Sequence, residues 1–235
     1  MGKIVITGAS SGIGWAIAQE LAKFNKPMLL HRNKNKDLPL SELPANAEVI
    51  TADFSSPDDL KQFIDKLDDT DILVNAAAYT VTELIPQTSD ESIEQMIAVN
   101  ITALSKICKA VIPQMCSKRR GVIVNISSAT ASKVYRGQGI YAGTKAFAET
   151  FSKAIAAEYG RKGIRCNCVA PGAINTGTLS LLLNIGEDQV KQANAANRLG
   201  TPQDVAAAVF FLCREDNSFI NGAVLHVDGG HWMGI

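Results

Sequence analysis

A glycine-rich turn near the start of the chain restricts its fold more than any other feature. The turn, Thr7-Gly-Ala-Ser-Ser-Gly-Ile-Gly14, lies between an expected strand at residues 3–7 and an expected helix at residues 13–24. Residues without a Cβ allow backbone N–H groups to approach a pyrophosphate, and the helix N-terminus adds partial positive charge there. An ordinary βα turn has the same composition, but the further strand that follows the helix favours nucleotide binding.

The rest of the chain continues this alternation. Further strands are expected at residues 27–31, 47–51, 71–75, 121–128, 164–169 and 223–227, and helices at residues 58–67, 89–115, 140–159 and 202–213. The alternation predicts right-handed crossovers and a Rossmann-type doubly wound parallel sheet of about seven strands with helices on both faces. No internal repeat or linker is visible, so residues 1–235 are expected to form a single α/β domain, with residues 176–201 as a substrate loop or lid.

Composition limits the partners of the chain. Lys plus Arg and Asp plus Glu are both 23, so nothing global favours nucleic acid or an anionic membrane. No apolar stretch approaches the roughly 20 residues of a membrane span, and no signal-peptide pattern precedes the first strand. The 5 cysteines form no disulfide framework, which suits a cytoplasmic protein. Cys166 and Cys168 alternate along an expected strand without further ligands nearby, so no metal is expected.

One stretch carries a pattern that suits carbonyl chemistry. The apolar run 121–128 ends in two hydroxyls, Ser127 and Ser128, and the helix that follows contains Tyr141 and Lys145. The two helical residues are spaced i, i+4, so they share one helix face. A hydroxyl at the end of a strand, facing such a pair, could hold and protonate a carbonyl oxygen. A solvated Tyr–Lys pair gives the same spacing, so the neighbouring motifs decide between the two interpretations.

The end of the second strand bears on the choice of cofactor. In a dinucleotide fold this end meets the adenosine ribose, and an NAD site usually presents Asp or Glu there. This chain has Arg32-Asn33 instead, and a guanidinium suits the extra 2′-phosphate of NADP. A solvated turn is the alternative. We therefore expect NADP(H) to be preferred, with NAD(H) as the second choice.

Taken in order along the chain, the motifs resemble the short-chain dehydrogenase/reductase family. They are T-G-x-x-x-G-x-G at residues 7–14, Asp53, Asn75-Ala, Asn100, Ser128, Tyr141, Lys145, Pro171-Gly172 and Thr176. Two further segments, Arg198-Leu-Gly-Thr-Pro and Gly222-Ala-Val-Leu-His-Val-Asp-Gly-Gly, resemble the branch that contains 3-oxoacyl-acyl-carrier-protein reductases. The resemblance covers essentially the whole chain.

The resemblance implies a role for each of these positions. It implies that Asn100, Ser128, Tyr141 and Lys145 are catalytic, with Asn100 fixing a water that links Lys145 to solvent. It implies that the cofactor contacts Gly8, Ser10, Ser11, Gly12, Ile13, Gly14, Arg32, Asn33, Asp53, Phe54, Asn75, Ala76, Ala77, Tyr141, Lys145, Pro171, Gly172, Ile174 and Thr176. Two departures affect these contacts: the family pattern Asn-Asn-Ala-Gly is Asn75-Ala-Ala-Ala78 here, and Ser11 stands where NADP-preferring members often carry a basic residue.

The resemblance also implies a reaction. Hydride transfer to a carbonyl carbon leaves charge on the oxygen, to which Tyr141 can donate a proton and Ser128 a hydrogen bond. The ammonium of Lys145 is expected to lower the tyrosine pKa from its usual value of about 10. The preferred substrate is a 3-oxoacyl thioester, delivered either as a small molecule or on an acyl carrier protein. A small ketone, a sugar or a steroid is the alternative.

Two other function classes compete with this one. A regulatory protein that senses NADP(H) without turnover has no need of a proton donor, so the presence of all four catalytic residues argues against it. A sugar-nucleotide epimerase of a related branch is disfavoured by the glycine spacing and the short C-terminal half. Alanines along residues 142–157 allow close approach of another helix, and the resemblance also implies an interface there with the long helix at 89–115, so a homotetramer is expected. Two basic clusters, Lys118-Arg119-Arg120 and Arg161-Lys162, could attract an acidic carrier protein, or they could be ordinary solvated loop charges.

Overall fold

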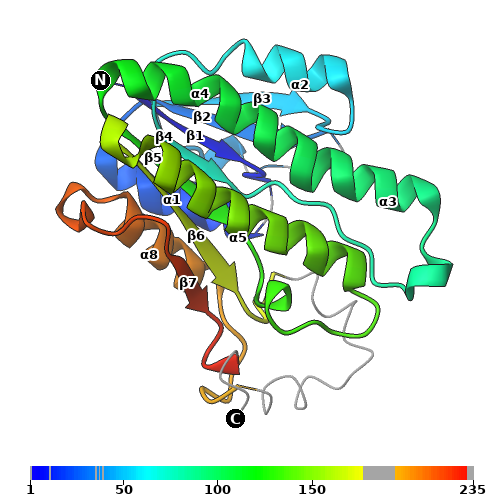
Figure 1. Cartoon of the computed structure of the whole chain (residues 1–235). Helices are drawn as coiled ribbons and strands as arrows, with labels where there is room; N and C mark the ends of the chain where they lie inside the picture. The colour runs from blue at the N-terminus through cyan, green and yellow to red at the C-terminus, as the bar shows by residue number, and fades with distance from the viewer. Residues whose placement is uncertain are drawn as a thin grey trace.

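The computed structural model describes residues 2–10, 12–34, 36, 38, 40–176 and 194–231. Its centre is a parallel sheet of seven strands in the order β3-β2-β1-β4-β5-β6-β7 (Figure 1). The strands are β1 (Lys3–Thr7), β2 (Met28–Asn33), β3 (Ala47–Ala52), β4 (Thr70–Asn75), β5 (Gly121–Ile126), β6 (Ile164–Pro171) and β7 (Val224–Val227). The predicted Rossmann-type fold class is thereby confirmed.

Helices cover both faces of the sheet (Figure 1). The α-helices are α1 (Gly12–Leu21), α2 (Pro57–Ile64), α3 (Asp90–Ile97), α4 (Leu104–Lys118), α5 (Gly139–Tyr159) and α8 (Pro202–Cys213). The 3-10 turns are η1 (Ala22–Phe24), η2 (Leu40–Glu42), η3 (Ile85–Gln87), η5 (Ala129–Ala131), η6 (Gly160–Lys162) and η7 (Glu215–Asn217), and η4 (Ala98–Ala103) is a π-helical turn.

Strand alternation divides the apolar residues into two cores. Ile4 and Ile6 of β1 belong to the core formed with α1 and α8, whereas Val5 belongs to the core formed with α2, α4 and α5. Successive side chains of a strand point to opposite faces, so a strand buried on both faces reads as a continuous apolar run. Phe63 of α2 and Met115 of α4, each with 0% of its surface exposed, anchor the second core.

The long helix expected at residues 89–115 differs from the prediction. It runs as α3, the π-helical turn η4 and α4, and it ends at Lys118 because Arg119 takes a left-handed backbone conformation with a φ of 51°. An 18-residue window of the combined helix 90–118 has a mean hydropathy of 1.4. By length and composition alone this helix could cross a membrane, which the sequence did not predict. One face of α4 packs on the sheet through Ile107, Val111 and Met115, which identifies it as a core helix.

The strand order creates one topological switch point, between β1 and β4. β1 has β2 on one side and β4 on the other, so the crossovers that leave β1 and β4 run in opposite directions. Ligands of doubly wound sheets bind at this topological switch point, beyond the carboxyl ends of the strands. The turns that follow Thr7, Ala52, Asn75 and Ile126 all open at this edge. The carboxyl edge of the sheet is therefore where a functional site is expected.

Candidate active site

A cavity of about 580 Å³ lies at this carboxyl edge. Many of the residues predicted from the sequence line it: Gly8, Ser10, Ile13, Asn33, Asp53, Phe54, Ala76, Ala77, Ser128, Tyr141, Lys145, Pro171, Gly172, Ile174 and Thr176. Gly12, Gly14, Arg32, Asn75 and Asn100 are described but are not part of the lining. Ser11 and most of the predicted substrate loop, residues 177–193, lie outside the described residues.

The glycine-rich turn has the shape that a pyrophosphate requires. Gly8 has a φ of +70°, and a Cβ there would lie 2.6 Å from the backbone N of Ala77. A Cβ on Gly14 would lie 2.1 Å from the carbonyl oxygen of Gly8, so the start of α1 packs directly on the turn. The Thr7 hydroxyl accepts hydrogen bonds from the N–H groups of Ala76 and Ala77, each at 3.1 Å, and ties the β1 turn to the β4 turn. The residues present thus fit a dinucleotide.

The far end of the cavity is polar and lies beside the exits of β2 and β3. Ser10 Oγ accepts from the N–H of Asn33 at 3.3 Å. Asp53 Oδ1 accepts from both the N–H and the hydroxyl of Ser55, at 2.9 and 2.7 Å, which fixes its carboxylate at the start of the following turn. Lys36 lines the cavity here, although the sequence analysis considered only Arg32 as a cation for this end. Arg32 donates from Nε to Thr51 Oγ1 at 3.2 Å.

The other end of the cavity brings together the residues suited to carbonyl chemistry. Ser128 lies just after β5 and Tyr141 lies on α5, and both side chains line this end of the cavity, where the Ser128 hydroxyl is close enough to lower the pKa of the phenol slightly. Ser128 Oγ accepts from Thr130 Oγ1 at 2.7 Å, so its own proton is free to point at the phenol. Lys145 Nζ lies 5.6 Å from the centre of the Tyr141 ring and donates to the Ile126 carbonyl at 2.8 Å. The spacing predicted from the sequence therefore places three functional side chains around one position.

The electrostatics of this group differ from the expectation. Burial raises the pKa of Tyr141 to about 12, against a smaller lowering by the Ser128 hydrogen bond. Burial likewise lowers the pKa of Lys145 to about 8. The predicted net lowering of the tyrosine pKa is therefore wrong: the net shift is upward, because burial of the phenol outweighs the charge of an ammonium that lies 5.6 Å from the ring centre and bonds a backbone carbonyl. Desolvation of a charged form outweighs a charge at this distance, and the phenol is held protonated at neutral pH.

Asn100 lies in the π-helical turn η4 and is buried, with 3% of its surface exposed. Its amide accepts from the N–H of Tyr79 and donates to the Tyr79 carbonyl, both at 2.8 Å, and also donates to Thr144 Oγ1 at 3.0 Å. Thr144 in turn donates to the Tyr141 carbonyl at 2.8 Å. Asn100 therefore joins the β4 exit loop to the helix that bears Tyr141. The water predicted between Asn100 and Lys145 stays a prediction.

Asn75 is buried within the sheet rather than at the cavity surface. Its Nδ2 donates to Asn125 Oδ1 at 2.8 Å and lies 3.4 Å from the sulfur of Cys108. Asn125 Nδ2 donates to Ser152 Oγ at 2.8 Å, so a short polar chain links β4 and β5 to α5. Burial raises the pKa of the Cys108 thiol to about 12, so this cysteine stays protonated. No group of His, Cys, Asp and Glu in the described part of the chain is arranged to hold a metal ion.

Several lining residues were not predicted as site residues. His31, Lys36, Ala78, Tyr79, Thr80, Gln95, Val99, Ile126 and Ser127 also line the cavity. His31 had a usable signal, since it is a polar residue at the end of an apolar strand where the cofactor was already expected. Gln95 and Val99 had none, because their helix approaches the cavity only through the tertiary fold.

Comparisons with known proteins agree with this geometry. The profile of the family described as Enoyl-(Acyl carrier protein) reductase matches residues 8–231. The 3-oxoacyl-[acyl-carrier-protein] reductase FabG of Escherichia coli (strain K12) is 35% identical over 239 residues, which cover 99% of this chain and 98% of that protein. Among solved structures, ElxO with NADP bound is 31% identical, with a TM-score of 0.88 over 99% of this chain and 100% of that one. The structure of 4-hydroxyisoleucine dehydrogenase complexed with NADH is 26% identical, with a TM-score of 0.92 over 100% of both chains.

The fold and the similarity to known proteins show that this chain is an NAD(P)-dependent oxidoreductase built on a Rossmann-type sheet. Within that class, the motif order and the near full-length similarity show that the chain belongs to the short-chain dehydrogenase/reductase family. The resemblance predicted from the sequence is thereby confirmed.

Proposed function

We propose that this enzyme reduces the carbonyl of a 3-oxoacyl thioester and prefers NADPH. The observation that carries the proposal is that the Ser128 hydroxyl and the Tyr141 phenol line the same end of the cavity, with the Lys145 ammonium 5.6 Å from the centre of the phenol ring. Two hydroxyls that meet at one point provide a site for one oxygen atom. The similarity to the FabG reductase supports a 3-oxoacyl thioester as the compound that supplies this oxygen.

The protein's own residues handle the proton. Tyr141 carries its proton at neutral pH because burial raises its pKa to about 12. It donates that proton to the carbonyl oxygen as negative charge grows there, while Ser128 donates a hydrogen bond to the same oxygen. Lys145 stands behind the phenol, and its positive charge stabilises the phenolate left after transfer. Thr130 and Asn100 position Ser128 and the Tyr141 helix through the hydrogen bonds described above.

The remaining lining residues hold the cofactor, which when bound supplies the hydride. The turn at Gly8 and Ser10 cradles the pyrophosphate, Asp53 faces the adenine edge, and Pro171 to Thr176 border the nicotinamide end. The preference for NADPH rests on the cations at the β2 exit, Arg32 and Lys36, and on the similarity to ElxO with NADP bound. The similarity to a dehydrogenase complexed with NADH keeps NADH as the second cofactor.

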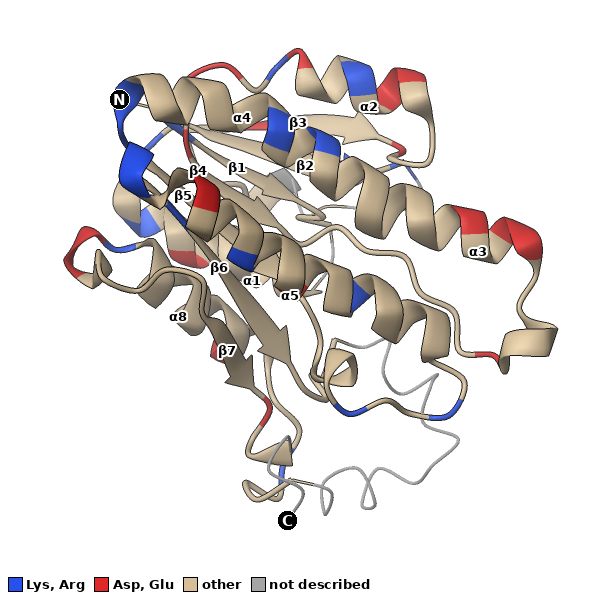
Figure 2. Cartoon of the chain, viewed as in Figure 1, with Lys and Arg blue, Asp and Glu red and all other residues tan. Residues whose placement is uncertain are grey.

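Delivery of the substrate by a carrier protein depends on where the basic residues lie. Lys and Arg lie in several places (Figure 2): along α4 and α5, on the loop that leads to α5, and at the amino edge of the sheet beside the end of α4. There, Lys118 and Arg120 form ion pairs with Asp71, and Arg119 donates to the Arg161 carbonyl at 3.2 Å. These basic side chains therefore already form ion pairs and hydrogen bonds within the protein. They can assist a carrier protein only if a second subunit brings them to a neighbouring cavity.

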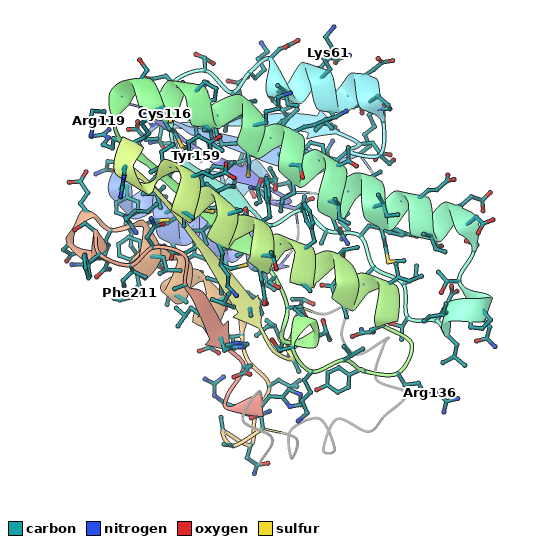
Figure 3. All side chains as sticks on the ribbon, in the orientation of Figure 1. Lys61, Cys116, Arg119, Arg136, Tyr159 and Phe211 are labelled. Carbon is teal, nitrogen blue, oxygen red and sulfur yellow. The ribbon has the colours of Figure 1, made fainter. Side chains whose placement is uncertain are left out.

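Another pair of basic residues follows the lining residue Ser128 along the chain. Lys133 and Arg136 follow Ser128 on the loop that leads to α5, and Arg136 is exposed. Figure 3 labels Arg119 and Arg136 at opposite ends of the molecule. An acidic carrier protein that docks on the same subunit would therefore meet Arg136 rather than Arg119.

The exposed face of α5 suits packing against another subunit. We propose a single-domain chain that forms a homotetramer in the cytoplasm, with α4 and α5 at the interface. Along α5 the alanines and Gly143 allow close approach of another helix, and Gly143 has nothing within 4 Å of its Cβ position. Light scattering at micromolar concentration tests the assembly, and a monomer would remove this part of the proposal.

The test of the function is NADPH oxidation with a panel of carbonyls. We expect the highest kcat/KM with an acetoacetyl thioester, whether small or carrier-linked, and lower values with a small ketone, a sugar and a steroid. The carrier arm compares wild type with Arg136→Glu and with Arg119→Glu/Arg161→Glu. Docking predicts a loss confined to the carrier-linked substrate and relieved by salt. Turnover of a sugar or steroid alone would reassign the substrate, and no turnover with intact NADP⁺ binding would favour a sensor.

A further inference from the structure

The inference concerns His31, a buried residue that no motif of the family assigns. His31 is the fourth residue of β2, with only 2% of its surface exposed, and its side chain lies on the wall of the cavity. His31 follows the apolar residues Met28 to Leu30, and its two ring nitrogens each need a hydrogen-bond partner because they are removed from water. Both nitrogens have one, and the two partners belong to different turns.

The first partner is in the pyrophosphate turn. The N–H of Gly8 donates to His31 Nδ1 at 3.0 Å. The backbone repeats the link, since the N–H of Ala9 donates to the His31 carbonyl at 2.9 Å. Gly8 is also the residue whose positive φ and close approach to Ala77 set the shape of the turn. By accepting from the Gly8 N–H, the imidazole therefore fixes the backbone at the start of the pyrophosphate turn.

The second partner is at the adenine end. His31 Nε2 lies 3.1 Å from the Ala52 carbonyl, the last residue of β3 before Asp53. Because Nδ1 accepts from an N–H, Nε2 must carry the proton and donate to this carbonyl. The ring also stacks on Phe54, with 3.8 Å between centroids and 11° between planes. Asp53 and Phe54 both line the cavity where the adenine is expected.

We infer that His31 is a positioning residue that couples the pyrophosphate turn to the adenine turn and so sets the affinity for the adenosine half of the nicotinamide cofactor. Its neutral form fits this role, because a second ring proton would face the Gly8 N–H. Burial lowers the pKa of His31 to about 4, so the imidazole is neutral across the physiological range. The inference rests on the proposed cofactor site, but it adds a residue with no contact to the reacting groups.

A purely structural role is the competing explanation, since His31 also packs against Phe63 at 5.5 Å between centroids. Phe63 supplies the matched control. It lies in the same cluster, 5.0 Å from the Phe54 ring, but it is fully buried in the core and does not line the cavity. Phe63→Leu loosens the packing under the two turns without removing the hydrogen bond to Gly8.

The experiment measures dissociation constants of NADP⁺ and of ADP-ribose by calorimetry, together with melting temperature and kcat at saturating NADPH. We expect His31→Phe, which keeps a ring but removes the acceptor, to weaken both ligands by about tenfold or more, as expected for a buried donor left without a partner. We expect kcat at saturation within about threefold of wild type. Phe63→Leu should lower the melting temperature and leave both dissociation constants within about twofold.

Two further variants keep the test decisive if His31→Phe does not fold. An Asn side chain can place an oxygen near the position of Nδ1, whereas Gln reaches toward the position of Nε2. His31→Asn should therefore retain more NADP⁺ affinity than His31→Gln. The inference is overturned if His31→Phe binds as wild type does, if Phe63→Leu weakens binding equally, or if Gln rescues affinity better than Asn. Failure of wild type to bind NADP⁺ would instead refute the proposed function.

Discussion

Each edge of the sheet buries an ionisable group, and the two groups differ in whether neighbouring charges compensate for the burial. At the amino edge, Asp71 is 3% exposed and is surrounded by three cations: Lys26 Nζ at 2.8 Å, Lys118 Nζ at 2.9 Å, and Arg120. At the carboxyl edge, Lys145 is 5% exposed and its ammonium donates to the Ile126 carbonyl, while burial keeps the Tyr141 phenol beside it protonated.

The difference separates stability from chemistry. Burial alone would raise the pKa of Asp71, but the hydrogen bonds from Lys26, Lys118 and Arg120 hold it well below its usual range. That arrangement stabilises the folded state. Burial lowers the pKa of Lys145, which means that the charged form is disfavoured by folding. Such a group lowers stability and is expected only where its reactivity is used. The comparison predicts that substitutions at the two edges have opposite consequences.

Tyr141→Phe gives the largest expected effect. The substitution removes one oxygen and leaves the ring in place, so folding and NADPH binding should persist. Because general acid–base groups contribute about 10²–10⁴-fold, kcat should fall by at least about 100-fold. Steady-state kinetics and cofactor titration measure the two quantities. Tyr159→Phe makes the same chemical change at the other end of α5 and should leave kcat unchanged.

Lys145→Met comes next and sharpens the comparison most. We expect kcat to fall by about tenfold or more and the KM for NADPH to rise, because the proposed mechanism uses Lys145 to support both the phenolate and the nicotinamide ribose. We also expect the melting temperature to rise by a few degrees, since a desolvated ammonium is replaced by an apolar chain of similar length. Lys153→Met, at an exposed position of the same helix, is the control. A fall in melting temperature would contradict the assignment of Lys145 as a destabilising group.

The pH dependence of this variant follows from the direction of the shift. The pKa of Lys145 is lowered from 10.5 to about 8, so the folded state binds fewer protons than the unfolded state between these values. The penalty is complete below about pH 8 and disappears as pH rises toward 10.5. Wild-type stability should gain from this group over that window, and Lys145→Met should lack the gain. Denaturant titrations at a series of pH values measure it.

Asp71→Asn tests the amino edge. Removing the carboxylate leaves three cations around a neutral amide, and we expect a loss of about 2 kcal/mol, or about 4–8 °C in melting temperature. Because the pKa of Asp71 is lowered, its contribution is present above the unfolded value of about 3.9 and is lost as pH falls below it. The variant should therefore lose least at low pH. Asp68→Asn, at an ion pair whose carboxylate is 80% exposed, should change stability by less than about 0.5 kcal/mol.

Arg32→Asp has the smallest expected effect and concerns only cofactor choice. A guanidinium near the β2 exit favours a 2′-phosphate, whereas a carboxylate repels it and can bind the ribose hydroxyls. We expect wild type to have the higher kcat/KM with NADPH and the variant to have it with NADH. Lys36→Ala tests the second cation and should lower the NADPH preference without reversing it. A wild-type preference for NADH would show that the cofactor assignment is wrong.

The fold and most of the site could be predicted from the sequence, for identifiable reasons. Strand and helix periods revealed the alternation. Tyr141 and Lys145 were recognisable from the order of the motifs around them, because their spacing alone fits a solvated pair equally well. Asn100 was placed correctly along the chain, but the π-helical turn around it was not expected, because a one-residue widening leaves no periodic signal. His31 was missed as a site residue although it is a polar residue at the end of an apolar run, because its two hydrogen-bond partners come from other strands and cannot be read from its neighbours in the sequence. The predicted direction of the Tyr141 pKa shift was wrong because the burial of the phenol cannot be read from residue spacing.

The most direct measurement of the central claim records kcat and melting temperature on the same samples of Tyr141→Phe and Asp71→Asn. The account predicts that Tyr141→Phe loses at least about 100-fold in kcat while its melting temperature stays within about 2 °C of wild type. It predicts that Asp71→Asn loses about 4–8 °C and keeps kcat within about twofold. Full activity in Tyr141→Phe, or a large loss of kcat in a folded Asp71→Asn protein, would contradict the separation of the two edges.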